Sequence, residues 1–469
     1  MSDLYRKTAT ECVELLHSRE VSSVELVQAA QQRIEAVNPS VNALPCVLAD
    51  RAMKQARQFD DRRLTGKDAG VLQGLPIAVK DYNDVGGAPT TYGSPLYADY
   101  VPEQSDATVQ TLELNGAIPI AKSNVPEWAG GHTFNPVYGT TKNPWDGSKS
   151  AGGSSGGSAA ALASGMVWLA TGNDLGGSLR TPAAFNSIVG LRPSPGVVPR
   201  GSRLQPFDTL WVEGPMARNV TDAALMLDAG AGFHPDDPLS FACSSGLYSQ
   251  SITSAANPVR VAFSSDLGVV PVAKEIAAIT ERAASQFSSI GVDVTNDIPD
   301  FSGVLDAFQT LRGILLGTMM SELLAAHRED IAPEIVGNIE LGMNVTSAQI
   351  FAAERTRWEL YKQVNQFFKS HDVLICPSAS IAPFPADQRY VEEIDGKPLN
   401  TYIDWFSITF ALTMTACPVL SLPCGFTSAG LPVAIQLMGR PRGEAELLRA
   451  AYILEQQLGI DSQLPVDPR

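Results

Sequence analysis

Two glycine- and serine-rich stretches hold the residues of this sequence best suited to chemistry. Residues 152–158 read GGSSGGS, and residues 171–180 read TGNDLGGSLR. The hydroxyl groups of Ser154, Ser155 and Ser178 are candidate nucleophiles, because a serine attacks a carbonyl carbon once another group takes its proton. The glycines leave backbone N–H groups open to an approaching anion. Three kinds of site are compatible with these residues.

A phosphate-binding loop is the first of these. Glycine-rich turns that precede a helix bind phosphate through their N–H groups. The sequence has no G-x-x-x-x-G-K-[ST], and residues 152–158 lack the preceding strand and the following acidic residue of a dinucleotide-binding fold. A phosphate site is therefore disfavoured.

A serine activated by histidine is the second. Residues 153–157 match G-x-S-x-G, a motif that belongs on a tight turn between a strand and a helix. Residues 143–149 read as a loop instead, and of five histidines only His132 lies near the motif in sequence. A loop histidine is more often solvated or structural. The match is interpreted as accidental.

A serine–serine–lysine arrangement is the third. Lys80 ends a short apolar stretch, residues 72–81, that reads as a strand. Burial can lower the pKa of a lysine by several units, and a neutral lysine can accept a serine proton. A single lysine at a strand end is more often a surface charge, so the spacing alone leaves this possibility open.

The stretch from Gly152 to Ala183 resembles the signature of the amidase signature family. The resemblance continues in GLPIAVKD (74–81), GTTKNPWD (139–146), GLRPS (190–194), GPMAR (214–218) and GLPVAIQL (430–437). It covers about residues 5–230 and 370–460 and leaves the middle of the chain poorly matched. The diagnostic positions within the signature are Gly152, Ser154, Ser155, Gly157, Asp174, Gly176, Ser178, Arg180 and Pro182.

This resemblance implies a role for each candidate. By position, Ser178 corresponds to the acylated nucleophile, Ser154 to a bridging serine and Lys80 to the base. The bond between Gly153 and Ser154 is expected to be cis. The family implies no cofactor and no metal.

The resemblance also implies groups that support the reaction. Ser155 is expected to form a hydrogen bond near the proton relay, and Asp174 and Arg180 to form a structural ion pair. Backbone N–H groups are expected to converge on the developing oxyanion. The donors are those of Leu175, Gly176, Gly177 and Ser178.

The elements that must position these residues suggest an α/β protein. Apolar strand-like runs at 72–81, 117–122, 373–376, 418–423 and 433–437 alternate with helical patterns. The family implies an α/β/α sandwich around a mixed sheet. We expect one domain over residues 1–469, with N-terminal helices at 5–65, a catalytic core at 70–230, a helical cap or insertion at 271–370, and strands and a helix at 372–460 that complete the core.

Local signals place the first helices. Thr10 or Ser22 can cap a helix, and Asn38-Pro39 is expected to end the helical pattern that precedes it.

The charge and cysteine content of the chain restrict the kinds of molecule that it is expected to bind. The 34 Lys and Arg residues against 50 Asp and Glu give a net charge of −16, without clusters of basic residues. This balance argues against nucleic acid and anionic membrane surfaces as partners, because both require such clusters. Six scattered cysteines indicate reduced thiols in a cytoplasmic protein. We expect a small-molecule amide as the substrate, and a homodimer remains open.

The sequence says least about the substrate. The resemblance to the family and the aromatic content of the chain favour a small aryl or alkyl amide as the substrate. One alternative is an amidotransferase subunit, but that subunit usually carries threonines where this chain has Asn173 and Leu175. A second alternative is a homologue that binds a ligand without catalysis. Aromatic residues that could line an acyl pocket, or pack in the core, are Trp128, Phe134, Phe207, Trp211, Tyr402, Trp405, Phe406 and Phe410.

Overall fold

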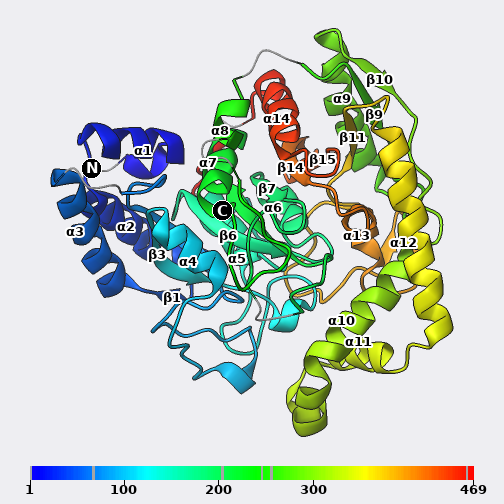
Figure 1. Ribbon diagram of the computed structural model, residues 1–469, viewed down its shortest axis with the longest axis horizontal. Coiled ribbons are helices and arrows are strands. Elements are labelled where there is room, and N and C mark those ends of the chain that lie inside the picture. Colours follow the sequence, from blue (N-terminus) through cyan, green and yellow to red (C-terminus); the bar gives the residue numbers. More distant parts are fainter. Residues whose placement is uncertain (1–2, 66–68, 202–204, 244–246, 254–256, 461–462) are drawn as a thin grey trace.

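An eleven-stranded mixed sheet forms the centre of the molecule. The computed structural model describes residues 3–65, 69–201, 205–243, 247–253, 257–460 and 463–469. The strand order is β1-β3-β2-β6-β8-β7-β14-β15-β11-β9-β10. Figure 1 shows the sheet with helices packed around it, which confirms the predicted α/β class with a mixed central sheet.

The sheet combines parallel and antiparallel pairs. Strand β2 pairs in parallel with both β3 and β6, and β9 does so with both β10 and β11, whereas the other pairs are antiparallel. The strands are β1 (Cys46–Val47), β2 (Leu75–Lys80), β3 (Ala117–Ser123), β6 (Leu169–Asp174), β7 (Val189–Arg192), β8 (Val212–Ala217), β9 (Arg260–Phe263), β10 (Asp293–Thr295), β11 (Val373–Pro377), β14 (Val419–Phe426) and β15 (Pro432–Met438). Two separate hairpins are β4 (Lys142–Asn143) with β5 (Asp146–Ser150), and β12 (Glu393–Ile394) with β13 (Lys397–Pro398).

Helices cover both faces of this sheet. Successive residues of β11 belong to different hydrophobic clusters: Ile375 belongs to the cluster that includes residues of α9 and α14, and Leu374 to the cluster that includes residues of α6 and α13. This alternation is what two covered faces require. The helices are α1 (Ala9–Ser18), α2 (Ser23–Val41), α3 (Ala49–Leu64), α4 (Ala107–Leu114), α5 (Gly156–Ala163), α6 (Arg180–Asn186), α7 (Val220–Gly230), α8 (Leu247–Ser251), α9 (Lys274–Ser289), α10 (Val304–His327), α11 (Pro333–Met343), α12 (Ser347–Phe367), α13 (Ser407–Thr413) and α14 (Glu444–Leu458).

The first helices differ from the sequence expectation in two details. The cap of α1 is Thr8, which forms a reciprocal capping box with Glu11, whereas Thr10 lies inside the helix and donates its hydroxyl to Asp222. Ser22 caps α2 as expected. Helix α2 does not end at Asn38-Pro39 but runs on to Val41, with Pro39 inside it.

The segment 271–370 divides into two parts. Helix α9 packs on β14 and β15, and β10 extends the main sheet, so this first part belongs to the central layers. Helix α10 packs on both α11 and α12. Helices α10 and α11 lie at the lower right of Figure 1, and α12 runs along its right side. Among the described stretches, no helix has both the length and the apolar character needed to cross a bilayer. All six cysteines are free thiols.

Candidate active site

Two neighbouring parallel strands bring the predicted residues to one edge of the sheet. Lys80 is the last residue of β2, and Asp174 is the last residue of β6. Because β2 and β6 are parallel, their carboxyl ends lie at the same edge, which is where open α/β sheets bind ligands. The loop from β6 to α6 carries Ser178, and Ser154 lies just before α5. Residues that are distant in sequence therefore meet here.

The amine of Lys80 is fully buried and has three close partners. Its Nζ lies 2.7 Å from Ser154 Oγ, 2.8 Å from Ser155 Oγ and 2.6 Å from Asn173 Oδ1. The ring of Tyr82 covers it, with the ring centroid 4.8 Å from Nζ. Lys80 is therefore not the surface charge that a strand-end lysine usually is.

Burial changes the protonation of this lysine. Loss of hydration lowers the pKa of Lys80 to about 7, although the carboxylates of Glu213 and Asp174 act in the opposite direction. A substantial fraction of Lys80 is consequently neutral at neutral pH. A neutral amine has a lone pair that can accept a proton.

Ser154 and Ser178 occupy different surroundings. Ser154 is buried next to Lys80, and the peptide bond between Gly153 and Ser154 is cis, as expected from the sequence. Ser178 is partly exposed and lines a pocket. Among the described residues, no hydrogen bond joins Ser154 Oγ to Ser178 Oγ. Catalytic hydrogen bonds are often formed only when substrate is bound, so this geometry is compatible with a relay.

The loop between β6 and α6 supplies backbone donors to the same pocket. Leu175, Gly176 and Ser178 line it, and in the described part of the chain their N–H groups have no protein acceptor. Gly177 differs from the expectation, because its N–H donates to Asp174 Oδ1 at 2.9 Å. Of the four N–H groups predicted to bind the oxyanion, that of Gly177 therefore has an acceptor within the protein.

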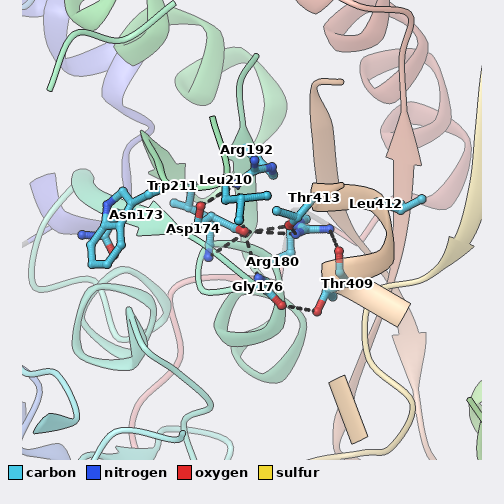
Figure 2. Close-up of polar contacts among 12 residues, drawn as sticks. Asn173, Asp174, Gly176, Arg180, Arg192, Leu210, Trp211, Thr409, Leu412 and Thr413 are labelled. Carbon is cyan, nitrogen blue, oxygen red and sulfur yellow. Dashed lines mark hydrogen bonds and ion pairs between the residues drawn. The ribbon is translucent and has the colours of Figure 1, made fainter. Parts of the chain in front are cut away.

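Gly177 is fixed by what surrounds it. Its φ of +123° lies in a region that side chains rarely adopt, and a Cβ here would lie 2.2 Å from Thr409 Oγ1. Thr409, on α13, donates its hydroxyl to the carbonyl of Gly176 at 2.7 Å (Figure 2). The peptide between Gly176 and Gly177 is thus held at both its carbonyl and its N–H.

A buried ion cluster braces this loop. Arg180 makes two hydrogen bonds of 3.0 Å to the carboxylate of Asp174, and Arg192 lies 3.3 Å from the same carboxylate (Figure 2). Burial would raise the pKa of Asp174, but the two guanidinium groups outweigh it and hold that pKa well below its ordinary value. The pairing of Asp174 with Arg180 was expected from the sequence. Arg192 was noted only as part of a motif.

His132 is not placed to act as a base for the candidate serines. Burial lowers its pKa to about 4, so the ring is neutral, and its Nδ1 has no hydrogen-bond partner among the described residues. The ring packs edge-on against Phe384. His132 is therefore a buried structural residue rather than a solvated one, and it is not hydrogen-bonded to any candidate serine in the described part of the chain.

Two cavities lie along one face of α10. The pocket that contains Ser178 is small, about 40 Å³, and α10 contributes Phe308 and Arg312 to it. The second cavity is about 350 Å³, and its walls are largely aromatic. Leu175 lines the first pocket and also packs against the aromatic side chains of the second. The residues around the second cavity are Tyr82, Tyr92, Tyr97, Tyr100, Trp128, Trp211, Leu316, Met319, Met320 and Leu323.

The aromatic residues singled out in the sequence separate into several environments. Trp128 and Trp211 line the larger cavity, whereas Tyr402, Trp405 and Phe406 line the pocket of Ser178. Phe410 is buried and stacks on Phe308, Phe134 borders a different groove, and Phe207 is exposed. The four tyrosines between residues 82 and 100 were not identified from the sequence as cavity residues. Four tyrosines in so short a stretch could have indicated an aromatic site.

Metal ligands are the last chemical feature to consider. In the stretches that the structure describes, no group of three or more His, Cys, Asp or Glu side chains could hold a metal ion.

A family model for amidases matches residues 25–448. The chain belongs to the amidase signature family. Among its curated relatives, an acylamidase of Rhodococcus erythropolis is 33% identical over 460 residues, covering 97% of this chain and 96% of that protein. The A-type subunit of the glutamyl-tRNA(Gln) amidotransferase of Moorella thermoacetica is 33% identical over 479 residues, covering 97% of each.

Solved structures of the family agree with the fold. A bacterial aryl acylamidase superimposes with a TM-score of 0.90 at 28% identity, covering 98% of this chain and 99% of that one. The 6-aminohexanoate cyclic dimer hydrolase, solved with substrate, gives a TM-score of 0.87 at 26% identity, covering 97% and 98%. The α/β/α sandwich of amidase signature enzymes is thereby established for this chain, and the chain is an amidase.

Proposed function

We propose that this amidase hydrolyses a small aryl or alkyl amide through an acyl enzyme on Ser178, with Lys80 as the base and Ser154 as the bridge. The observation that carries the proposal is the buried Lys80 amine, which contacts Ser154 beside the pocket of Ser178. The aromatic cavity next to that pocket supports the substrate class.

The partners of Lys80 favour one direction of proton transfer. A neutral amine has two N–H donors and one lone pair. The Oδ1 of Asn173 can only accept, and Ser155 Oγ lies 3.5 Å from the carbonyl of Asn173, to which its own proton can point. The two N–H donors of Lys80 are thus used by Asn173 and Ser155. The lone pair is left for the hydroxyl proton of Ser154.

The reaction follows from this arrangement. Lys80 takes the proton of Ser154, and Ser154 takes that of Ser178 as the Ser178 oxygen bonds to the amide carbon. The N–H groups of Leu175, Gly176 and Ser178 donate to the oxyanion, where a single donor contributes on the order of 10²–10³ in rate. The relay then returns the proton to the leaving amine. Water hydrolyses the acyl enzyme by the same path.

The aromatic cavity is suited to an apolar group of the substrate. Cavities of roughly 300–1,000 Å³ with mostly apolar walls are typical of small-molecule sites, and this one is about 350 Å³. The rings of Tyr92 and Trp128 are parallel, with centroids 5.0 Å apart, and those of Tyr82 and Trp211 are tilted at 6.5 Å. A planar aryl ring or a short alkyl chain can pack among such surfaces.

The A-type component of an amidotransferase is the competing function, since relatives of that name match nearly the full length of the chain. Steady-state rates on acetanilide, butyranilide, benzamide, a long-chain fatty amide and glutamine separate the two. We expect turnover of the anilides to exceed that of glutamine and of the fatty amide. Turnover of glutamine alone would favour the amidotransferase component, and turnover of the fatty amide alone would contradict the substrate class.

A further inference from the structure

A buried arginine lines the pocket of Ser178. Arg312 lies on α10 and is only 8% exposed, and together with Tyr402 it lines that pocket. Neither residue belongs to the signature stretch, and neither takes part in the proton relay.

The hydrogen bonds that Arg312 and Tyr402 form within the protein occupy the lone pairs of the tyrosine hydroxyl and leave donor groups unused. Arg312 Nη2 donates to Tyr402 Oη at 2.6 Å, and Asn338 Nδ2 donates to the same oxygen at 2.6 Å. A tyrosine hydroxyl has two lone pairs and one proton. With both lone pairs occupied, the proton of Tyr402 remains to be donated, and no acceptor for it exists among the described residues.

The charge of Arg312 is also uncompensated within the described part of the chain. Its hydrogen-bond acceptors there, Tyr402 and Gln309, are both neutral, and no carboxylate lies within ion-pair distance. Arg180, which is fully buried, has the carboxylate of Asp174 as its counterion. A buried guanidinium without a counterion is costly, and a bound anion removes that cost.

We propose that the preferred substrate is an amide that carries a carboxylate, and that Arg312 and Tyr402 bind this carboxylate. The inference rests on the proposed function, because it assigns the substrate of the same site. The guanidinium and the tyrosine hydroxyl supply converging donors of the kind that carboxylates accept. The pocket volume of about 40 Å³ is too small for a second ring, so the group that approaches Arg312 must be small, as a carboxylate is.

The distance along α10 between the two cavities indicates the orientation of the bound substrate. Arg312 faces the smaller pocket, and Met320 faces the aromatic cavity, eight residues along the same helix. At 1.5 Å per residue this separation is about 12 Å. The aryl group and the carboxylate therefore belong at opposite ends of the substrate, with the scissile amide between them.

Matched anilides test the inference. The monoanilides of succinic and glutaric acid are compared with butyranilide and valeranilide, which have nearly the same shape but no charge. We expect kcat/KM for the acids to exceed that for the neutral anilides at least tenfold. Equal rates, or faster neutral anilides, would overturn the inference while leaving the proposed amidase intact.

Two variants assign the effect to the residues. Arg312→Gln is expected to lower kcat/KM for the acids, mainly through KM, by about tenfold to a hundredfold more than it lowers kcat/KM for butyranilide. Tyr402→Phe is expected to act in the same direction, more weakly. The control is Arg328→Gln, which removes an exposed arginine paired with Glu340. Equal losses on acid and neutral anilides would show that Arg312 is merely structural.

Binding provides a readout that does not depend on turnover. Calorimetry on the Ser178→Ala variant should show the glutaric monoanilide binding at least tenfold more tightly than valeranilide, and Arg312→Gln in that background should abolish the difference. Equal affinities would overturn the inference even if the enzyme hydrolyses anilides. A retained difference without any turnover by the wild type would instead contradict the proposed function and leave the carboxylate site standing.

Discussion

The side-chain oxygen of Asn173 lies 2.6 Å from the amine of Lys80, and both residues are buried. Because this oxygen only accepts hydrogen bonds, it holds one N–H of the amine whatever the protonation state of Lys80. Asn173 thereby orients the lysine lone pair. Sequence comparison indicated this residue only as a departure from the amidotransferase pattern.

Asn173→Asp is expected to move the pH profile of the enzyme. A carboxylate this close to Lys80 Nζ stabilises the charged amine and raises its pKa by about one to three units. The acid limb of kcat/KM should shift to higher pH by that amount. Asn173→Leu, which removes the acceptor without adding charge, should lower kcat with no such upward shift. An unshifted profile in Asn173→Asp would contradict the role of Lys80 as the base.

Wild-type activity should itself report the protonation of Lys80. The base must be neutral, and its pKa is about 7, so kcat/KM should rise as pH increases through 7 and level off about one unit above. Below about pH 6 it should fall about tenfold per unit. Lys80→Ala should lose about 10²–10⁴ in kcat. Full activity of Lys80→Ala at pH 7 would eliminate this base.

Gly177→Ala should destabilise the protein. The positive φ and the 2.2 Å approach to Thr409 Oγ1 together cost about 2 kcal/mol or more. Gly176→Ala is the matched control, because its φ is not in the left-handed region and its Cβ would lie no closer than 3.3 Å to any neighbour, the end of the Phe308 ring. Denaturant unfolding of the two variants should separate them, with Gly176→Ala close to wild type. Similar stabilities would show that the loop can relax.

Asp174→Asn should also unfold more readily. The change leaves Arg180 and Arg192 buried without their carboxylate, and breaking a buried pair in this way costs about 3–5 kcal/mol. The exposed pair of Arg328 with Glu340 offers the comparison, where Glu340→Gln should cost less than about 1 kcal/mol. A loss of activity in Asp174→Asn without a loss of stability would instead assign the carboxylate a direct chemical role.

The strands and the catalytic edge could be predicted because their signals are local. Apolar runs of strand length ended close to where the structure ends β2, β3 and β15, and the signature motif held Lys80 and Ser178 at recognisable positions. Helix ends were less predictable. Pro39 does not end α2 but lies in its last turn, two residues before Val41.

What the sequence could not show depends on contacts between distant segments. Gly177 carries an N–H as any glycine does, and only the folded loop reveals that Asp174 takes it. Likewise, Arg312 and Tyr402 are 90 residues apart in sequence and meet where α10 packs against α13, which begins shortly after Tyr402. No local pattern marks such a pair.

Labelling with a serine-directed fluorophosphonate, followed by mass spectrometry of the labelled peptide, tests the central claim most directly. The wild-type enzyme should be modified once, at Ser178, and Ser178→Ala should not be modified at all. Ser155→Ala, which removes a neighbouring hydroxyl, should still be labelled at Ser178. Labelling that persists in Ser178→Ala, or that maps to Ser154 or Ser155 in the wild type, would contradict Ser178 as the nucleophile.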